Sequence, residues 1–326
     1  MTLVSGVLAD TQTALLLTAP LLTKHDDDSL QLLRPGEYWR FTSFLRQNGW
    51  GPADLLTKDA EDILRHDSLP IGADRLRPLL ARGFRLSQAM EQWRSRALWV
   101  MSIADDAYPS GLKQLAKHAP PVVYGCGDPC LLEQGGLAVV GSRNADADAL
   151  CYTESIAGLV ARSERTLVSG GALGVDQAAM RGALEAGGKV LGVLANDLQR
   201  AAMRPEHRDV LLDSRLALIS PYDPAAGFNV GNAMRRNKMI YAMADAALVV
   251  NSDFQQGGTW AGAIEQLDKF RLVPVYVRGE TGKAFESLIT KGARPWPGPE
   301  NPEAFRQTLA SQPTPQELPA QASFWS

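Results

Sequence analysis

The chain has 326 residues, of which 45% are hydrophobic and 21% are charged, and these proportions exclude a collagen-like or largely disordered protein. The formal net charge of −3 at pH 7 excludes a generally basic nucleic-acid binder, so any DNA-binding surface has to be a local patch. The three cysteines, at positions 126, 130 and 151, form neither a metal-ligand set nor an even disulfide framework, which favours a reducing compartment.

An apolar stretch near the N-terminus, at residues 13–22, is too short to cross a bilayer. Pro20 interrupts it, and no basic region precedes it as a secretory signal would require. We therefore expect a cytoplasmic protein that does not associate with a membrane.

Residues 1–97 are predicted to form a small helical module. Apolar residues recur at helical spacing from Tyr38 to Leu45. Three short amphipathic segments follow, at residues 59–64, 76–80 and 86–93. Because a fold does not fix a function, we favour a packing module without chemistry of its own over a module that contacts nucleic acid.

From residue 98 onward, short apolar runs alternate with helical patterns. Strands are predicted at residues 98–103, 122–124, 137–141, 166–169, 189–194, 216–219, 246–250 and 272–277. Helices are predicted at residues 146–163, 175–187, 204–213, 231–244, 259–269 and 282–291. This spacing suits right-handed βαβ crossovers, so the predicted fold class is α/β, with a doubly wound, mostly parallel sheet.

Three of the predicted strands are followed by glycine-containing turns. In such a turn, backbone amides and a helix N-terminus face an anion, and only small residues let a phosphate come close. Because the carboxyl ends of parallel strands meet at one edge of a sheet, the three turns are expected to form one phosphate site. The candidate residues are Gly141, Ser142 and Arg143 in the first turn, Ser169, Gly170, Gly171 and Gly174 in the second, and Gly257, Gly258 and Thr259 in the third.

The densest group of basic residues lies in the predicted helix at residues 231–244. It contains Arg235, Arg236 and Lys238, with Asn237 among them. Basic side chains bind phosphates irrespective of sequence, and an asparagine amide can reach a base or a sugar, so all four are candidates for nucleic-acid contact. The chain has neither a P-loop motif nor an NAD fingerprint, so P-loop hydrolysis and a bound cofactor are not expected.

The composition changes after residue 291, because seven of the 20 prolines lie beyond that point. A proline-rich segment of this kind is typical of an extended chain without a core. Residues 292–326 are therefore predicted to form a flexible tail.

Several motifs, in order over residues 98–278, carry a resemblance to a known family. They are Tyr108-Pro-Ser-Gly-Leu-Lys-Gln-Leu, Pro120-Pro-Val-Val-Tyr-Gly-Cys-Gly-Asp, Val139-Val-Gly-Ser-Arg, Ser169-Gly-Gly-Ala-Leu-Gly-Val-Asp and Arg236-Asn-Lys-Met-Ile. As a set they resemble the DNA-processing protein A (DprA/Smf) family. The resemblance implies an extended Rossmann-like fold that binds single-stranded DNA without hydrolysing a cofactor. It also implies a homodimer that loads the RecA recombinase on DNA, in recombination or in natural transformation.

The chain departs from that family's pattern at four places. Leu173 stands where the family usually has an arginine, and Met180 stands where a histidine is common. The third turn has Gln256-Gly-Gly-Thr in place of a Gly-Ser run. The winged-helix module of many members has no counterpart at the C-terminal end.

With these departures, the sequence is similar to that of a second family, the lysine-decarboxylase-like LOG phosphoribohydrolases. Those enzymes cleave the N-glycosidic bond of nucleoside monophosphates with an arginine and a glutamate. Arg236 and Glu265 would take these two roles here. This resemblance implies a phosphoribohydrolase as an alternative function. The acidic net charge and the missing arginine also leave open a divergent member that senses a free nucleotide in genome defence.

We therefore expect a helical module at residues 1–97, an extended Rossmann-like domain at residues 98–291 and a tail at residues 292–326. The expected function is non-catalytic binding of single-stranded DNA by a homodimer, with RecA as a partner and without a metal or cofactor.

Overall fold

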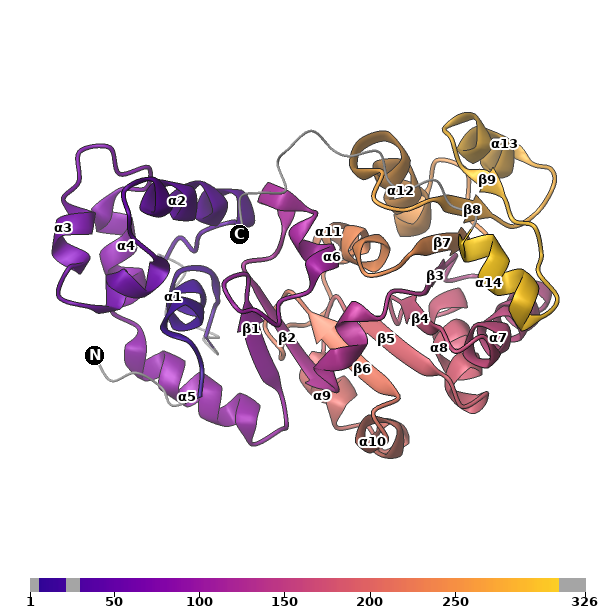
Figure 1. Cartoon of the computed structure of the whole chain (residues 1–326), viewed down its shortest axis with the longest axis horizontal. Coiled ribbons are helices and arrows are strands. Elements are labelled where there is room, and N and C mark those ends of the chain that lie inside the picture. Colours follow the sequence, from indigo (N-terminus) through magenta and orange to yellow (C-terminus); the bar gives the residue numbers. More distant parts are fainter. Residues whose placement is uncertain (1–5, 22–29, 311–326) are drawn as a thin grey trace.

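The structure is a computed structural model that describes residues 6–21 and 30–310, with a group of N-terminal helices beside a large α/β sheet (Figure 1). The N-terminal helices are α1 (Ala9–Thr18), α2 (Pro35–Gln47), α3 (Ala60–Leu64), α4 (Ala73–Leu80) and α5 (Gly83–Arg94), with a 3-10 helix, η1, at Pro52–Leu56. Their buried side chains belong to the same continuous hydrophobic core as those of the sheet.

Within the described residues, nine strands form one sheet in the order β1-β2-β6-β5-β4-β3-β7-β8-β9. The strands are β1 (Trp99–Ser102), β2 (Val122–Gly127), β3 (Leu137–Val140), β4 (Thr166–Ser169), β5 (Lys189–Val193), β6 (Leu216–Ser220), β7 (Ala246–Val249), β8 (Val275–Val277) and β9 (Arg294–Pro295). β2 pairs antiparallel with β1 and with β6, and all other neighbours are parallel. The predicted doubly wound, mostly parallel α/β fold is confirmed.

Helices cover both faces of this sheet. They are α6 (Ser110–Lys113), α7 (Ala147–Arg162), α8 (Val175–Glu185), α9 (Leu198–Ala202), α10 (Pro205–Leu212), α11 (Val230–Ala242), α12 (Gly257–Glu265) and α13 (Lys283–Thr290), with the 3-10 helices η2 (Ala116–His118) and η3 (Pro129–Glu133) and a π-helix, η4 (Gln266–Phe270). In Figure 1, α7, α8 and α10 lie below the sheet, whereas α11 and α12 lie above it. From β3 the strand order runs through β4 and β5 in one direction and through β7 and β8 in the other, so it reverses between β3 and β7. Open α/β folds bind ligands at the carboxyl ends of the strands at such a reversal.

α1 lies outside the helical segments that the apolar spacing predicts. Every residue from 11 to 17 is buried, because α1 contacts α2, α4 and α5 as well as β1 and β2. A helix that is buried on all sides has no polar face, so its sequence lacks the amphipathic period that identifies other helices. None of the helices in the described part of the chain is long and apolar enough to span a membrane.

The prediction of a flexible tail at residues 292–326 is wrong for residues 292–310. β9 pairs in parallel with β8, and a further helix, α14 (Pro302–Ala310), packs on α7. Asn301 Oδ1 accepts a hydrogen bond from the amide of Ala304 at 3.0 Å, and Pro302 is the first helical residue, a position that tolerates proline. Here the prolines delimit short elements, and the side chains of Phe305 and Leu309 are buried. Residues 311–326 lie outside the described part of the chain.

An ion pair between α2 and α4 gives the N-terminal helices a pH-dependent contribution to stability. Glu37 accepts hydrogen bonds from Arg75 at 2.8 and 3.1 Å, and these bonds lower the pKa of Glu37 to about 2. A carboxyl whose pKa is lower in the folded state stabilises the fold above its unfolded pKa, and this contribution is lost as the pH falls towards 2. We expect Glu37→Gln to lower the free energy of unfolding by about 1 kcal/mol at pH 7.

Urea denaturation at pH 7 and at pH 3 measures this contribution. The difference between wild type and Glu37→Gln should shrink by more than half at pH 3, whereas the exposed control Glu91→Gln should show little difference at either pH. An equal difference at both pH values would contradict the role of the Glu37 charge.

Candidate functional site

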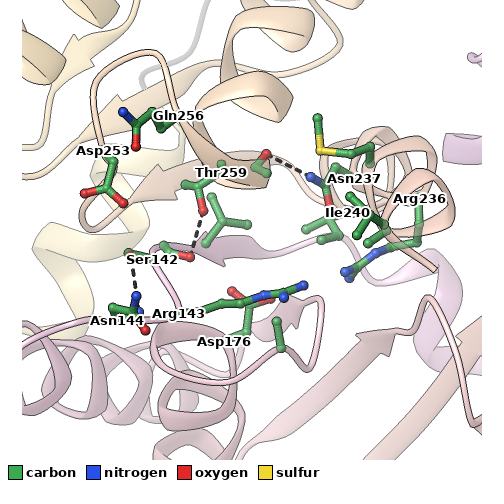
Figure 2. Close-up of a pocket in the computed structure, with 18 of the residues that line it drawn as sticks. Ser142, Arg143, Asn144, Asp176, Arg236, Asn237, Ile240, Asp253, Gln256 and Thr259 are labelled. Atoms are coloured by element: carbon green, nitrogen blue, oxygen red, sulfur yellow. Dashed lines mark hydrogen bonds between the residues drawn. The ribbon is translucent and has the colours of Figure 1, made fainter. Parts of the chain in front are cut away.

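A pocket of about 340 Å³ lies where the strand order reverses, at the carboxyl ends of β3 and β7 and beside α11 (Figure 2). Its lining comes from all three predicted turns and from α11. The lining residues are Val140, Gly141, Ser142, Arg143, Asn144, Ala172, Asp176, Phe228, Val230, Ala233, Met234, Arg236, Asn237, Ile240, Tyr241, Asp253, Gln256, Gly257, Gly258 and Thr259. A pocket of this size holds a small molecule or one unit of a polymer.

Hydrogen bonds fix the first turn at the floor of the pocket. The amide of Ser142 donates to Asn251 Oδ1 at 2.8 Å, and Asn251 is the second residue after the end of β7. Arg143 is exposed, and its guanidinium carbon lies 5.1 Å from the ring centroid of Phe228. The backbone is therefore held in place, while the Arg143 side chain stays accessible at the pocket mouth.

The third turn is tied to the first turn and to α11. Thr259 Oγ1 donates to the carbonyl of Gly141 at 2.7 Å, and Asn237 Nδ2 donates to the carbonyl of Gly258 at 2.9 Å. The side chains of Thr259 and Asn237 thus hold the pocket wall together, as the dashed lines in Figure 2 show.

The second turn contributes less to the pocket than the sequence predicts. Ser169 is fully buried and its hydroxyl donates to the carbonyl of Val139 at 2.7 Å, so this side chain faces the interior. Gly170, Gly171 and Gly174 are absent from the lining. Their smallness serves packing, since a Cβ on Gly170 would lie 2.0 Å from the guanidinium of Arg236.

Gly174 shows why this turn needs glycine. Its φ of +81° is left-handed, and a Cβ there would lie 2.4 Å from the carbonyl oxygen of Ser142. Gly174 therefore lets the start of α8 approach the first turn, and Gly170 leaves room for Arg236, whereas Ala172 and Asp176 line the pocket itself.

Arg236 and Asp176 form the charged part of the wall. The Arg236 side chain points towards Asp176 in Figure 2, although the residue is only 5% exposed. One of its terminal nitrogens donates to the carbonyl of Val193, but among the described residues no acceptor meets its Nε. The Nε atom is itself buried, so the guanidinium contributes positive charge to the pocket wall rather than an accessible Nε donor.

Burial raises the pKa of Asp176 to about 6, against the lowering influence of Arg236 and of the backbone amides of Ala172, Gly170 and Gly141. Burial likewise lowers the pKa of Arg236, while Asp176 opposes that change. At pH 7 Asp176 is therefore mostly ionised and balances part of the Arg236 charge, so that Arg143 supplies much of the positive potential at the mouth.

The basic residues of α11 do not act at one place. Consecutive residues of a helix are about 100° apart, so that Arg236 points inward while Arg235 is exposed. Neither Arg235 nor Lys238 lines the pocket. Lys238 instead lies beside Phe270, with its Nζ 5.7 Å from the ring centroid.

Glu265, the glutamate of the alternative enzyme hypothesis, is the last residue of α12 and does not line the pocket. Its carboxylate lies 3.5 Å from Lys269 Nζ. The structure thus does not bring Arg236 and Glu265 together in one pocket, and a phosphoribohydrolase centre built on them is not favoured.

The sequence predictions missed Phe228, Met234, Asp253 and the side chain of Gln256 among the lining residues. Phe228 lies in the connection that leads into α11 and is 53% exposed. An aromatic residue in a polar, glycine-containing connection just before the basic helix was the available signal for it.

Comparison with known proteins gives consistent results. The model of the DNA recombination-mediator protein A family matches residues 99–305. DprA of Mycobacterium tuberculosis strain H37Rv is 31% identical over 233 residues, which cover 68% of this chain and 57% of that protein. The chain thus spans less than two thirds of that relative. DprA of Bacillus subtilis is 25% identical over 217 residues, which cover 64% of this chain and 72% of that protein.

Two solved structures share the fold. DprA of Streptococcus pneumoniae superposes with a TM-score of 0.61 at 18% identity, over 86% of this chain and 99% of that one. DprA of Helicobacter pylori superposes with a TM-score of 0.53 at 22% identity, over 65% of this chain and 95% of that one.

Proposed function

The chain belongs to the DNA recombination-mediator protein A family, and on this premise we propose that it binds single-stranded DNA and acts without catalysis in DNA processing and recombination. The observation that carries the proposal is the pocket at the switch point, which is lined by the buried Arg236 and by the accessible Arg143. A phosphodiester supplies the charge and the acceptor oxygens that these two side chains lack.

The apolar part of the lining fits the same ligand. Phe228 and Met234 lie exposed at the mouth, and such side chains stack on or pack against unpaired bases irrespective of sequence. The Helicobacter pylori protein, whose reported structure concerns its mode of single-stranded DNA binding, shares this fold. That likeness supports a single strand, rather than a duplex, as the ligand.

The proposal includes the wider role that the family resemblance implies. The protein would act in the cytoplasm as a homodimer that extends the DNA track, and would present the bound strand to the RecA recombinase. Residues 1–97 would serve as a packing module against the Rossmann-like domain, consistent with the shared hydrophobic core. Glu265 does not support the alternative phosphoribohydrolase function, because it pairs with Lys269 away from the pocket.

Fluorescence anisotropy of labelled oligo-dT across a salt series tests the proposal. Wild type should bind saturably, with an affinity that falls linearly in the logarithm of the salt concentration. Arg143→Ala should weaken binding about tenfold and reduce the salt slope by about 0.7, the value for one lost phosphate contact on a single strand.

Arg65→Ala is the matched control, because Arg65 lies at the end of α3 and its side chain is 75% exposed. This control should bind like wild type. An absence of saturable binding by wild type at low salt would contradict the proposed function. Equal losses of affinity in Arg143→Ala and Arg65→Ala would show that the pocket is not where DNA binds.

A further inference from the structure

A second group of basic side chains surrounds one aromatic ring outside the pocket. Phe270, the last residue of η4, has Lys269 Nζ 4.8 Å and Lys238 Nζ 5.7 Å from its ring centroid. His118 meets the same ring edge-on, with centroids 5.5 Å apart. Lys117, the exposed neighbour of His118, adds a further cation. We call Lys117, His118, Lys238 and Lys269 the Phe270 cluster.

The positive charge of this cluster is poorly balanced. Glu265 lies 3.5 Å from Lys269, whereas Asp268 is engaged by Lys291 at 2.9 Å. Within the described residues, no carboxylate lies within 4.0 Å of Lys238 Nζ. Like charges crowded around a half-buried ammonium raise its free energy, so an anion bound among them would be stabilising.

The pKa values of Lys238 and His118 reflect burial together with this crowded positive charge. Burial lowers the pKa of Lys238, and the neighbouring Lys269 adds to this effect against Glu265. Burial together with Lys269, Lys238 and Lys117 lowers the pKa of His118. In both groups burial is the largest cause of the lowered pKa, neighbouring lysines add to it, and Glu265 is the carboxylate that opposes it.

The cluster is continuous with the pocket along α11. Met234 lines the pocket and is partly exposed at its mouth, and Lys238 follows it by four residues. Residues four apart lie on the same side of a helix, one turn of about 5.4 Å along its axis. A strand that leaves the pocket over Met234 therefore reaches Lys238 first and Lys269 next, because η4 packs against α11.

We propose that the Phe270 cluster is a second phosphate-binding site, which holds the backbone of the same DNA strand as it leaves the pocket. The inference rests on the proposed function and adds to it a direction for the bound strand, from Arg143 across Met234 to Lys238 and Lys269. Phe270 itself is buried and orients the two ammonium groups, so the bases are not read here. An acidic peptide would match the charge but gains nothing from the adjoining pocket, so DNA is the better fit.

The test compares oligo-dT strands of two lengths, about four and about 16 nucleotides, in anisotropy titrations across salt. The double variant Lys238→Gln/Lys269→Gln should bind the short strand like wild type, because the pocket is intact. With the long strand it should bind more weakly, and its salt slope should fall by about 1.4 for two lost phosphate contacts. The double variant Lys189→Gln/Lys283→Gln removes two exposed lysines outside the cluster and should match wild type with both strands.

Each result decides the inference. A salt slope for the long strand that is unchanged in Lys238→Gln/Lys269→Gln, while wild type binds normally, would overturn the second site alone and leave the cluster for an acidic protein partner. An equal loss in the control variant would also overturn it, since the effect would then reflect net charge. Failure of wild type to bind either strand would overturn the proposed function and this inference together.

Discussion

Replacing Arg236 with Met is expected to weaken binding of single-stranded DNA about 100-fold at pH 7, because a charged hydrogen-bond donor to the phosphate is lost. The free energy of unfolding should fall by about 3 kcal/mol, because Asp176 is left as an unpaired buried carboxylate. With Arg236 present the pKa of Asp176 is about 6, and loss of Arg236 raises it further, so the variant has either to bury an unpaired charge or to protonate this carboxyl. Methionine has a long, unbranched side chain that fills irregular space, so the loss reports charge more than a cavity. Anisotropy with oligo-dT and urea denaturation measure the two effects.

The double variant Arg236→Met/Asp176→Asn separates stability from binding. It should recover most of the lost stability, since a neutral amide replaces the unpaired carboxylate, while DNA binding stays weak. Wild-type affinity in the single variant would show that Arg236 does not contact the ligand. Recovery of both stability and affinity in the double variant would assign Arg236 a structural role only.

Replacing Phe305 with Ala is expected to lower the free energy of unfolding by about 3 to 5 kcal/mol, the usual cost of removing a fully buried phenyl ring. The ring is 0% exposed in α14, which packs on α7. The neighbouring variant Arg306→Ala alters an exposed position of the same helix and should stay within about 0.5 kcal/mol of wild type. Urea denaturation of both variants measures the difference.

A small effect of Phe305→Ala would mean that α14 contributes little to the folded state, in agreement with a tail. DNA binding by Phe305→Ala should match wild type under conditions where the variant is folded, because α14 does not line the pocket.

The sequence was most informative where a backbone geometry requires one residue type, as tight strand-to-helix turns require glycine. Apolar runs that end near glycine predicted β3 and β4 together with the turns after them, because strand-to-helix turns this tight tolerate few other residues. The apolar run of β7 was followed by a longer connection that reaches glycine only at Gly257. The resemblance to the DprA/Smf family, carried by motifs such as Val139-Val-Gly-Ser-Arg and Arg236-Asn-Lys, is confirmed by the family match over residues 99–305.

The sequence was least informative where tertiary contacts decide. A cluster such as Arg235, Arg236 and Lys238 does not reveal which member points inward, because this depends on how α11 packs on the sheet. Ser169 matched the pattern of an anion ligand, yet its hydroxyl completes a bond to β3. α14 was hidden by composition, since prolines that suggest an extended chain also begin a helix when they occupy its first turn.

The two edges of the sheet bear on how copies of the protein could associate. A free sheet edge offers unpaired amides and carbonyls that can pair with a strand of another molecule. At one edge, α1 packs beside β1, and at the other, β9 has only two residues, of which Pro295 has no N–H to donate. Among the described residues, neither edge is therefore a favourable template for strand addition. Self-association would then use helices or loops and leave each sheet separate, and the same two edges would protect the protein from edge-to-edge aggregation at high concentration.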